Sequence, residues 1–364
     1  MTDQYYMQKA IELSLRGIGM VNPNPLVGAV IVKNNEIIGE GYHASFGEAH
    51  AEVMAINNAK ADCKGATMYV TLEPCSHFGK TPPCALKIID FRFQKVVIGI
   101  IDPNPLVSGK GIQLLKEAGI SVTTGVLSKE ITKVNEVFIN YITKKTPFVV
   151  MKTASTFDGK IATTSGDSRW ISGKGSRKLV HRLRQQYSGI MVGIVTVLLD
   201  DPELNIRDFK GKKKNPIKII VDSTARIPLN AKVLTSKNGA QTIIAVTNRA
   251  PEAKIKELIK IGAIVIVCPH TKQGVDLSYL MIELGKMSID SILLEGGGTL
   301  NYSAITQGIV NKVINIIAPK IVGGVNSPTT VTGKGIEQLS NAIKIKDLST
   351  EIIGDDILLE GYIE

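Results

Sequence analysis

Apolar strand-like runs alternate with amphipathic helical segments along almost the whole chain. In the N-terminal part the pattern predicts helices near 4–16, 49–60, 83–89 and 109–118, strands near 26–33, 36–42, 66–71 and 95–101, and then one further strand and helix. Such alternation is typical of α/β architecture, in which helices cover a largely parallel sheet. We therefore expect an α/β fold for this part.

The alternation continues after a polar segment, TKKTP at 143–147. Strands are predicted near 148–154, 189–197, 217–222, 242–247, 263–267, 291–295 and 312–318, and helices near 176–187, 251–261, 277–286 and 299–307. A chain of 364 residues exceeds the usual size of a single core. We expect two domains, 1–145 and 146–364.

Composition and charge narrow the classes of protein and partner. The chain is 44% hydrophobic and 21% charged, which is typical of a globular protein. Its longest apolar stretch, Gly189 to Leu199, is too short to cross a bilayer, and the N-terminus lacks a secretory pattern. We therefore expect a cytoplasmic protein without a membrane partner.

A net charge of +10 favours anionic partners, either phosphorylated small molecules or nucleic acid. The densest basic run, Lys210 to Lys214, contains no aromatic residue on which a base could stack. Aromatic residues make up only 5% of the chain. Small phosphorylated molecules are thus the expected partners, and a deaminase whose C-terminal half binds nucleic acid is the alternative.

Two of the four cysteines, Cys75 and Cys84, flank the stiff segment SHFGKTPP. In a reducing compartment such a pair binds a metal more often than it forms a disulfide. Cys63 and Cys268 have no comparable context. A catalytic zinc site takes three protein ligands and keeps one position for water, and His50 supplies the nitrogen donor that the two cysteines lack.

His50 begins the sequence His-Ala-Glu at the start of a predicted helix. Glu52 points in another direction from His50, so it suits a proton carrier beside zinc-activated water. Zinc deaminases combine His-x-Glu with Pro-Cys-x-x-Cys. Here eight residues separate the cysteines instead of two, so the match is partial.

Two alternatives compete with a catalytic zinc site. In a structural zinc site His77 or Cys63 fills the fourth ligand position, and in a zinc-stabilised binding module no reaction occurs.

The segments NPNPLVG at 22–28 and DPNPLVSG at 102–109 resemble each other, but the similarity is too short to establish a repeat. Whether the two segments meet at one site is left open by the sequence.

The long cysteine spacer, together with NPNPLVG, GEGYH at 39–43 and GEAHAE at 47–52, resembles the bifunctional riboflavin-biosynthesis deaminase/reductase family. KTASTFDGKIAT at 152–163, DSRWISG at 167–173, GIVTVLLDDPELNIR at 193–207 and LLEGGGTLN at 293–301 extend the resemblance over nearly the whole chain. It implies a cytidine-deaminase-like α/β/α domain followed by a dihydrofolate-reductase-like α/β domain. The implied reactions are zinc-dependent hydrolytic deamination of 2,5-diamino-6-ribosylamino-4(3H)-pyrimidinone 5′-phosphate and NADPH-dependent reduction of its ribosyl group to ribityl.

The resemblance also implies roles for individual residues. The zinc ligands are His50, Cys75 and Cys84, with Glu52 as the catalytic proton shuttle. Contacts to the first substrate come from Asn24, His43, His77 and Lys80. The dinucleotide is assigned to Ala154, Trp170, Thr196, Asp200, Ser223, Gly297, Gly298, Thr299, Leu300, Asn301, Tyr302 and Ser303. The second substrate is assigned to Ser168, Arg184, Leu204, Arg207 and Glu295.

Three further expectations accompany these assignments. Lys152 and Asp200 are candidates for protonation or orientation in the hydride step. The glycine turn before the helix in EGGGTLN can present backbone N–H groups to a pyrophosphate, although an ordinary turn has the same sequence character. The resemblance also suggests a homo-oligomer.

Overall fold

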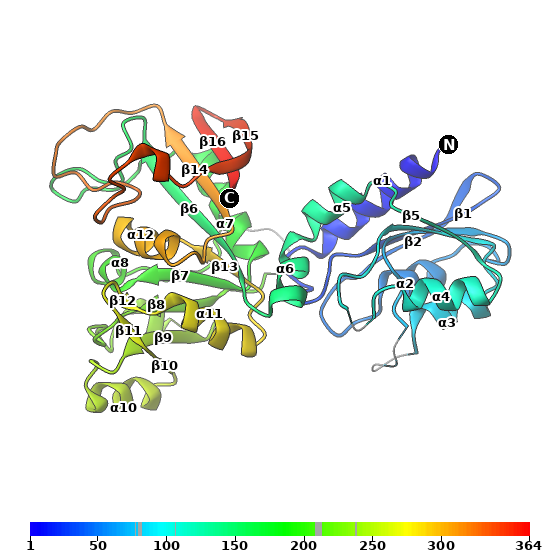
Figure 1. The fold of residues 1–364 in the computed structure, drawn as a ribbon, viewed down its shortest axis with the longest axis horizontal. Coiled ribbons are helices and arrows are strands. Elements are labelled where there is room, and N and C mark those ends of the chain that lie inside the picture. Colours follow the sequence, from blue (N-terminus) through cyan, green and yellow to red (C-terminus); the bar gives the residue numbers. More distant parts are fainter. Residues whose placement is uncertain (77, 79–81, 106, 208–212, 237–238) are drawn as a thin grey trace. The chain divides into compact units, whose positions relative to one another are not determined.

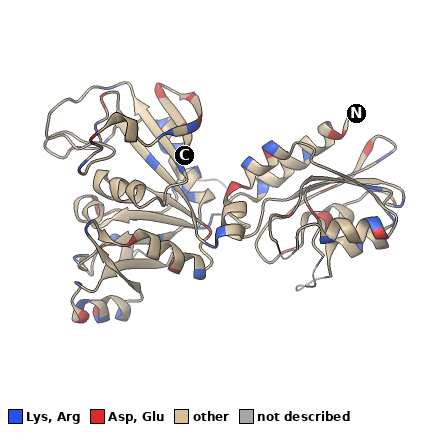
Figure 2. Cartoon of the chain, viewed as in Figure 1, with Lys and Arg blue, Asp and Glu red and all other residues tan. Residues whose placement is uncertain are grey.

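The computed structural model describes residues 1–76, 78, 82–105, 107–207, 213–236 and 239–364. These residues form two compact units, Met1–Lys144 and Lys145–Glu364, each with its own sheet (Figure 1). Lys and Arg are distributed over the elements of both units (Figure 2). Within the described ranges, no helix has the length and apolar character that a membrane crossing requires.

The first unit is built on a five-stranded sheet with the order β2-β1-β3-β4-β5. Its strands are β1 (Gly28–Lys33), β2 (Glu36–Tyr42), β3 (Thr67–Leu72), β4 (Lys95–Ile100) and β5 (Ser121–Thr124). β1 pairs antiparallel with β2 and β3, whereas β3, β4 and β5 run parallel. The carboxyl end of β3 therefore opens beside that of β4.

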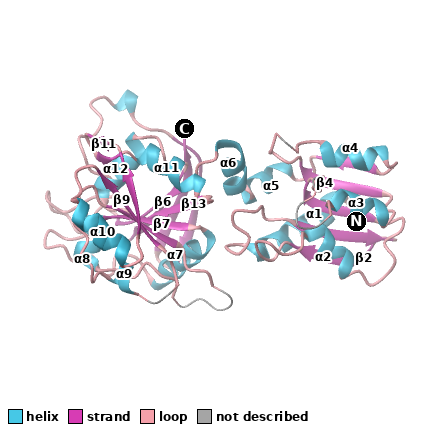
Figure 3. Cartoon of the chain, turned by 90° about the horizontal axis from the view of Figure 1, so that it is seen from below, coloured by secondary structure: helices cyan, strands magenta, loops and turns pink. Residues whose placement is uncertain are grey.

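Helices cover both faces of this sheet (Figures 1 and 3). On one face, α1 (Asp3–Ser14) and α5 (Ser128–Val134) pack on apolar side chains of β1, β3 and β4. On the other face lie α2 (Ala51–Asn57), α3 (Cys84–Asp90) and α4 (Lys110–Glu117). The 3-10 helix η1 (Leu15–Gly17) follows α1, and α6 (Glu136–Lys144) ends the unit.

Close packing fixes the position of α2 on the sheet. Gly41 of β2 lies so near this helix that an added Cβ would come within 2.3 Å of the backbone nitrogen of Ala55. A larger residue has no room there. The start of α2, which carries His50 and Glu52, is thereby held against β2.

The second unit contains a nine-stranded sheet with the order β10-β9-β8-β7-β13-β6-β14-β16-β15. Its strands are β6 (Phe148–Thr156), β7 (Gly189–Gly193), β8 (Ile217–Val221), β9 (Thr242–Thr247), β10 (Ile264–Cys268), β13 (Ser291–Leu294), β14 (Lys312–Ala318), β15 (Ile345–Ile353) and β16 (Asp356–Ile363). The strands from β10 to β14 are parallel, and β16 pairs antiparallel with both β14 and β15. β11 (His270–Thr271) and β12 (Gly274–Val275) form a separate two-stranded ladder.

Helices cover both faces of this second sheet as well. α11 (Leu277–Lys286) and α12 (Gly298–Thr306) contribute to one apolar core, and α8 (Ile194–Asp200), α9 (Lys232–Thr235) and α10 (Glu252–Lys260) contribute to the other. α7 (Lys174–Gln186) connects β6 to β7, and η2 (Leu339–Asn341) precedes the last two strands.

The structure corrects three details of the predicted elements. The strand predicted over 189–197 ends at Gly193, and the apolar residues after it begin α8. The end of the first unit contains two helices, α5 and α6, where one was predicted. The hairpin of β15 and β16 was not predicted, because almost every residue of β15 is exposed and its sequence lacks strand alternation.

Candidate functional site

The three predicted zinc ligands come from segments that converge on one side of the first sheet. His50 is the N-cap residue of α2 and Cys84 is the first residue of α3, directly after Pro83. Cys75 follows the carboxyl end of β3 by three residues. Two helix N-termini and one strand end therefore meet, which places the positive ends of two helix dipoles beside the thiols.

The donor atoms of these residues have the separations that zinc requires. The Nδ1 atom of His50 lies 3.6 Å from Cys75 Sγ and 3.3 Å from Cys84 Sγ, and all three donor atoms lie within 4.8 Å of one another. Tetrahedral zinc with ordinary bond lengths places its nitrogen and sulfur ligands about 3.5 Å apart. The residues present therefore fit a tetrahedral ion with three protein ligands.

The two thiols share a proton. Their mutual hydrogen bond lowers the pKa of Cys75 to about 4 and raises that of Cys84. The backbone N–H of Cys84 also donates to Cys75 Sγ at 3.2 Å, which stabilises a thiolate at Cys75. All four cysteines of the chain are free thiols, including this pair.

Glu52 lies beside the ligands and is 4% exposed. Burial, followed by the negative charge of Cys75, raises the pKa of Glu52 to about 7. A carboxyl group with such a pKa can both accept and release a proton near neutral pH, as a general acid and base must.

Glu52, His50 and Cys75 line a cavity of about 210 Å³. The cavity is lined by Asn24, Pro25, Val27, His43, His50, Ala51, Glu52, Leu72, Glu73, Cys75, Asp102, Asn104, Val107, Phe138 and Ile142. Both echo segments, 22–28 and 102–109, contribute to this lining. The question that the sequence left open is thus answered, because the two loops do converge on one cavity.

His43 is held in a single tautomer within this cavity. Its Nδ1–H donates to the carbonyl of Ala49 at 3.1 Å, and its Nε2 accepts an N–H from the Asn24 side chain at 3.1 Å. Burial lowers the pKa of His43, which favours the neutral ring. Asn24 and His43, two of the predicted substrate contacts, are thereby fixed beside the ligand set.

The other two cysteines and the two remaining predicted contacts of the first substrate have different outcomes. Cys63 is 3% exposed and packs in the apolar core, away from the ligand cluster, so it is no fourth ligand. Cys268 is likewise a core residue, at the end of β10. His77 and Lys80 lie outside the described residues, and their roles stay predictions.

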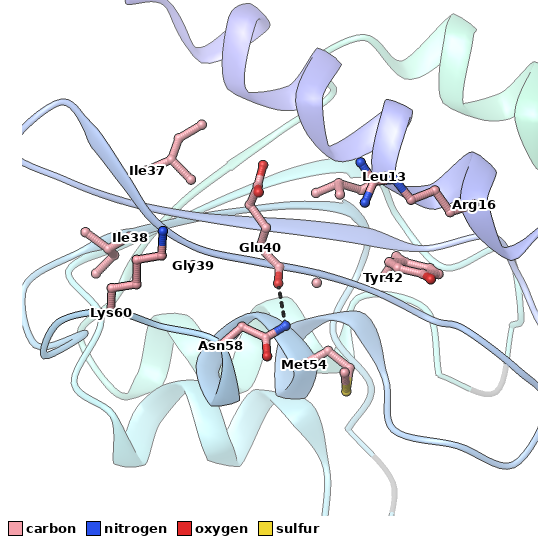
Figure 4. A pocket seen from close by; sticks show the side chains of 11 residues that line it. Leu13, Arg16, Ile37, Ile38, Gly39, Glu40, Tyr42, Met54, Asn58 and Lys60 are labelled. Atoms are coloured by element: carbon pink, nitrogen blue, oxygen red, sulfur yellow. Dashed lines mark hydrogen bonds between the residues drawn. The ribbon is translucent and has the colours of Figure 1, made fainter.

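A second cavity, of about 300 Å³, lies at the outer side of β2 (Figure 4). Arg16, Glu40 and Lys60 are among its lining residues, and Asn58 donates to the carbonyl oxygen of Glu40 at 3.0 Å. None of the predicted site residues that the structure describes lines it. His50, Cys75 and Glu52 line the smaller cavity and not this one.

In the second unit, Lys152, Arg184 and Glu295 come together. Arg184 donates through Nε to Glu295 Oε1 at 2.7 Å and through Nη2 to Oε2 at 3.0 Å. Lys152 Nζ lies 3.8 Å from the same carboxylate. The cluster forms because β6 and β13 are parallel neighbours whose register pairs Leu294 with Met151, so the next residues along, Glu295 and Lys152, lie side by side.

The candidate dinucleotide residues follow the carboxyl ends of four adjacent strands. Thr196 and Asp200 lie on α8 after β7, Ser223 follows β8, and Ala154 lies near the end of β6. Residues 297–303 follow β13, with Gly297 as the N-cap of α12. Ligands of parallel α/β sheets bind at this edge, and a helix N-terminus there suits a pyrophosphate. The residues present therefore fit a dinucleotide.

The remaining predicted residues of the second unit are Ser168, Trp170, Leu204 and Arg207. Arg207 is exposed, and its backbone N–H donates to His181 Nδ1 at 3.3 Å. Leu204 is buried, and Ser168 lies in the loop that precedes α7. Trp170 is 64% exposed, with the Arg177 guanidinium 4.8 Å from its ring.

Sequence reasoning missed several polar groups near these sites. Glu73 and Asn135 are buried and hydrogen-bonded to the two loops of the zinc cavity, and His181 lies beside Arg207. Glu73 lies two residues before Cys75 in the sequence TLEPC, and this position was the available signal. Asn135 is the C-cap residue of α5, in a part of the sequence without any motif.

Comparison with known proteins agrees with this geometry. The profile of the "Cytidine and deoxycytidylate deaminase zinc-binding region" matches residues 1–100, and that of the "RibD C-terminal domain" matches residues 147–359. The chain is 49% identical to the riboflavin biosynthesis protein RibD of Actinobacillus pleuropneumoniae, over 99% of this chain and 95% of the relative. It is 40% identical to that of Aquifex aeolicus, over 98% and 97%.

Solved structures give the same result. RibD of Acinetobacter baumannii matches with a TM-score of 0.89 at 36% identity, covering 100% of this chain and 99% of the other. A diaminohydroxyphosphoribosylaminopyrimidine deaminase/5-amino-6-(5-phosphoribosylamino)uracil reductase of Thermotoga maritima matches with a TM-score of 0.86 at 37% identity, with the same coverage. The predicted fold class is confirmed. The chain therefore belongs to the RibD family, the zinc- and NADPH-dependent deaminase/reductases of riboflavin biosynthesis.

Proposed function

We propose that the first unit is the deaminase domain and the second the reductase domain, with the division near residue 145. The zinc-binding-region match falls within the first unit and the RibD C-terminal match within the second, which supports this division. The deaminase substrate is 2,5-diamino-6-ribosylamino-4(3H)-pyrimidinone 5′-phosphate, and the reductase acts on the deaminated product.

His50, Cys75 and Cys84 are the zinc ligands in this proposal. When bound, zinc supplies a Lewis acid that lowers the pKa of water to about 7. The proposal rests above all on one observation, which is that the three donor atoms cluster beside a cavity lined by His50, Cys75 and Glu52. A cavity of about 210 Å³ has room for the ring that reacts.

Glu52 carries the proton of the hydrolysis. The reaction replaces a ring C–NH2 bond with C=O, consumes one water and releases ammonia. Glu52 takes a proton from the attacking water and gives it to the departing amine nitrogen. Its pKa of about 7 suits both transfers.

The surrounding residues orient the first substrate. Asn24 and neutral His43 offer hydrogen-bonding groups on one wall of the cavity. His77 and Lys80 complete the predicted contacts, and a lysine is suited to hold the 5′-phosphate as a flexible cation.

In the second unit, the second substrate is bound by Ser168, Arg184, Leu204, Arg207 and Glu295. Residues 297–303, with Ala154, Trp170, Thr196, Asp200 and Ser223, bind the dinucleotide, which supplies the hydride. The C1′–O4′ bond of the ribosyl ring first opens, O4′ takes the proton of the attached nitrogen, and a C1′=N bond forms. The hydride then adds to C1′ and a proton to that nitrogen. Lys152 can hold that proton, because burial lowers the pKa of this lysine and makes it a better acid.

Two coupled assays test this proposal. Zinc-replete protein is given the diaminopyrimidinone substrate, and ammonia is measured. The deaminated intermediate is then supplied separately with NADPH, and oxidation is followed. Absence of both reactions contradicts the proposal, whereas the absence of one alone contradicts the assignment of that unit.

We also propose that the protein is a cytoplasmic homo-oligomer that binds small phosphorylated pyrimidines and no nucleic acid. The exposed strand β15, at one end of the nine-stranded sheet, supports self-association because an unpaired edge can pair with another chain. Light scattering measures the oligomer. Affinity for RNA over a range of salt concentrations tests the exclusion of nucleic acid, since phosphate contacts produce a steep salt dependence.

A further inference from the structure

Each of the two loops that line the deaminase cavity is held by one buried polar side chain. The first loop, 22–28, is held by Asn135, which is 2% exposed. Asn135 accepts the N–H of Leu26 at 2.9 Å and donates to its carbonyl at 3.1 Å. The second loop, 102–109, is held by Glu73, two residues before the candidate ligand Cys75.

The Glu73 carboxylate uses both oxygens on this second loop and the helix that follows it. Oε2 accepts the N–H groups of Asp102 at 3.1 Å and Gly109 at 3.0 Å, from the two ends of the loop. Oε1 accepts those of Gly111 at 2.9 Å and Ile112 at 3.2 Å, in the first turn of α4. A carboxylate has about four acceptor positions, so these four donors occupy them all.

The segment that carries Glu73 is also packed tightly against α4. An added Cβ at Gly111 would lie 2.0 Å from the carbonyl oxygen of Pro74, which immediately precedes Cys75. The backbone N–H of Glu73 donates to the carbonyl of Ile100 at 3.0 Å, just before the loop begins. The loop is therefore fixed relative to the ligand segment at its start, at its end and through α4.

Between these fixed ends, the loop contributes Asp102, Asn104 and Val107 to the cavity wall. We propose that Glu73 is a positioning residue of the deaminase, whose carboxylate holds the second loop as a wall of the substrate cavity at a set distance from Cys75. Glu73 acts through the loop, because the loop and α4 occupy its oxygens. The inference rests on the proposed deaminase function of this cavity.

The substitution Glu73→Gln tests this role with little change of shape. Whichever way the amide is turned, its NH2 group faces two backbone N–H donors, so half of the hydrogen bonds are lost. We expect kcat/KM for deamination to fall about 10- to 100-fold, as for other supporting groups of active sites, mainly through a higher KM. Zinc content and NADPH oxidation by the second unit are expected to stay at wild-type values.

Glu117→Gln is the matched control. Glu117 is an exposed carboxylate on α4 that accepts a hydrogen bond from the Gln113 side chain at 2.8 Å. This variant is expected to retain the wild-type KM. Gly111→Ala disturbs the same contact from the other side while Glu73 stays intact, and it is expected to raise KM as Glu73→Gln does.

Amide hydrogen exchange monitors the loop directly. The N–H groups of Asp102, Gly109, Gly111 and Ile112 are expected to be protected in the wild type and to exchange faster in Glu73→Gln. Unprotected amides in the wild type overturn the proposal, and so does a wild-type KM in folded Glu73→Gln. Zinc loss that parallels the activity loss also overturns it, since Glu73 then supports the metal ligands rather than the loop.

If Glu73→Gln does not fold, Gly111→Ala tests the proposal instead. A wild-type KM in Gly111→Ala contradicts the proposal. Failure of the proposed function gives a different result. In that case wild-type protein releases no ammonia, while the four amides still report whether Glu73 holds the loop.

Discussion

Glu295 and Arg184 form a two-pronged ion pair in the second unit, with N–O distances of 2.7 and 3.0 Å. The side chain of Glu295 is 11% exposed and that of Arg184 14%. Lys152 Nζ lies 3.8 Å from the same carboxylate, so one anion stands between two cations. The negative charge of Glu295 therefore balances the positive charges of Arg184 and Lys152.

Replacing Glu295 with Gln leaves two partly buried cations without their counter-ion. Removal of one partner from a buried ion pair costs about 3–5 kcal/mol. We expect this loss in the free energy of unfolding of the second unit, together with loss of NADPH oxidation on the deaminated substrate. Hydrogen exchange in peptides of β6 and β13 measures the stability of this unit, and ammonia release is expected to persist.

Glu283→Gln provides the comparison for this prediction. Glu283 pairs with the more exposed Lys286 at 2.7 Å, on the surface of α11. Exposed pairs contribute about 0–1 kcal/mol, so reduction activity and stability are expected to stay close to wild type. Equal effects of the two substitutions are incompatible with a special role of the Glu295 cluster.

The same carboxylate predicts a pH dependence of stability. Burial opposes its charge, but Arg184 and then Lys152 lower the pKa of Glu295 from 4.5 to about 2. Because the folded state has the lower pKa, the charged group stabilises the second unit above pH 4.5, and this contribution is lost as the pH falls towards 2. It amounts to about 3 kcal/mol at neutral pH.

Hydrogen exchange of β6 and β13 between pH 6 and pH 3 measures this effect after correction for the intrinsic exchange rate. Stability is expected to decrease more steeply in the wild type than in Glu295→Gln, which has no carboxylate to protonate. Parallel curves for the two proteins contradict the assigned pKa.

Zinc binding is expected to release protons. In the metal-free first unit the pair Cys75–Cys84 retains one proton, which a zinc ion must displace to gain two thiolates. Calorimetric titration in buffers of different ionisation enthalpy measures the number released, with about one expected from the thiol pair.

Single substitutions test which cysteines bind the zinc ion. Cys84→Ser is expected to abolish tight zinc binding. Cys63→Ala changes a buried core cysteine outside the ligand cluster, so it is expected to lower stability yet bind zinc normally. Unchanged zinc affinity in Cys84→Ser contradicts the ligand assignment.

Glu52→Gln tests the proton carrier separately from the metal. The amide has a similar shape and cannot shuttle a proton, so deamination is expected to slow by about 10²- to 10⁴-fold while zinc content and the reductase activity are retained. Glu48→Gln, at an exposed carboxylate four residues earlier, is the control. A deamination rate within a factor of about two of wild type in Glu52→Gln means that another group moves the proton.

The chemistry of the zinc cluster could be predicted from the sequence because few residue types bind zinc. His50, Cys75 and Cys84 stood out by type and by their places next to predicted helix starts and a strand end, and the structure brings their donor atoms together. The role of Glu73 could not be predicted. Its partners are backbone N–H groups of residues 102–112, and no side-chain pattern marks where those groups point.

The pattern of apolar residues did not predict the end of β7 or the presence of β15. Residues 189–199 form one apolar run, and β-branched residues continue beyond Gly193, so nothing in the pattern shows the change from β7 to α8. In β15 the exposed residues include Ile345, Leu348 and Ile352, whose spacing indicates no buried face. The tertiary position of a strand at the sheet edge determines this exposure.

The order of the strands has a consequence for biosynthesis on the ribosome. The first sheet uses only strands between Gly28 and Thr124, so it can close while the rest of the chain is still being translated. β6 is the first strand of the second sheet to be made, yet both of its neighbours, β13 and β14, come from residues 291–318. At about 5–20 residues per second, its unpaired backbone edges and apolar side chains stay without these partners for many seconds, during which a chaperone can protect the nascent chain.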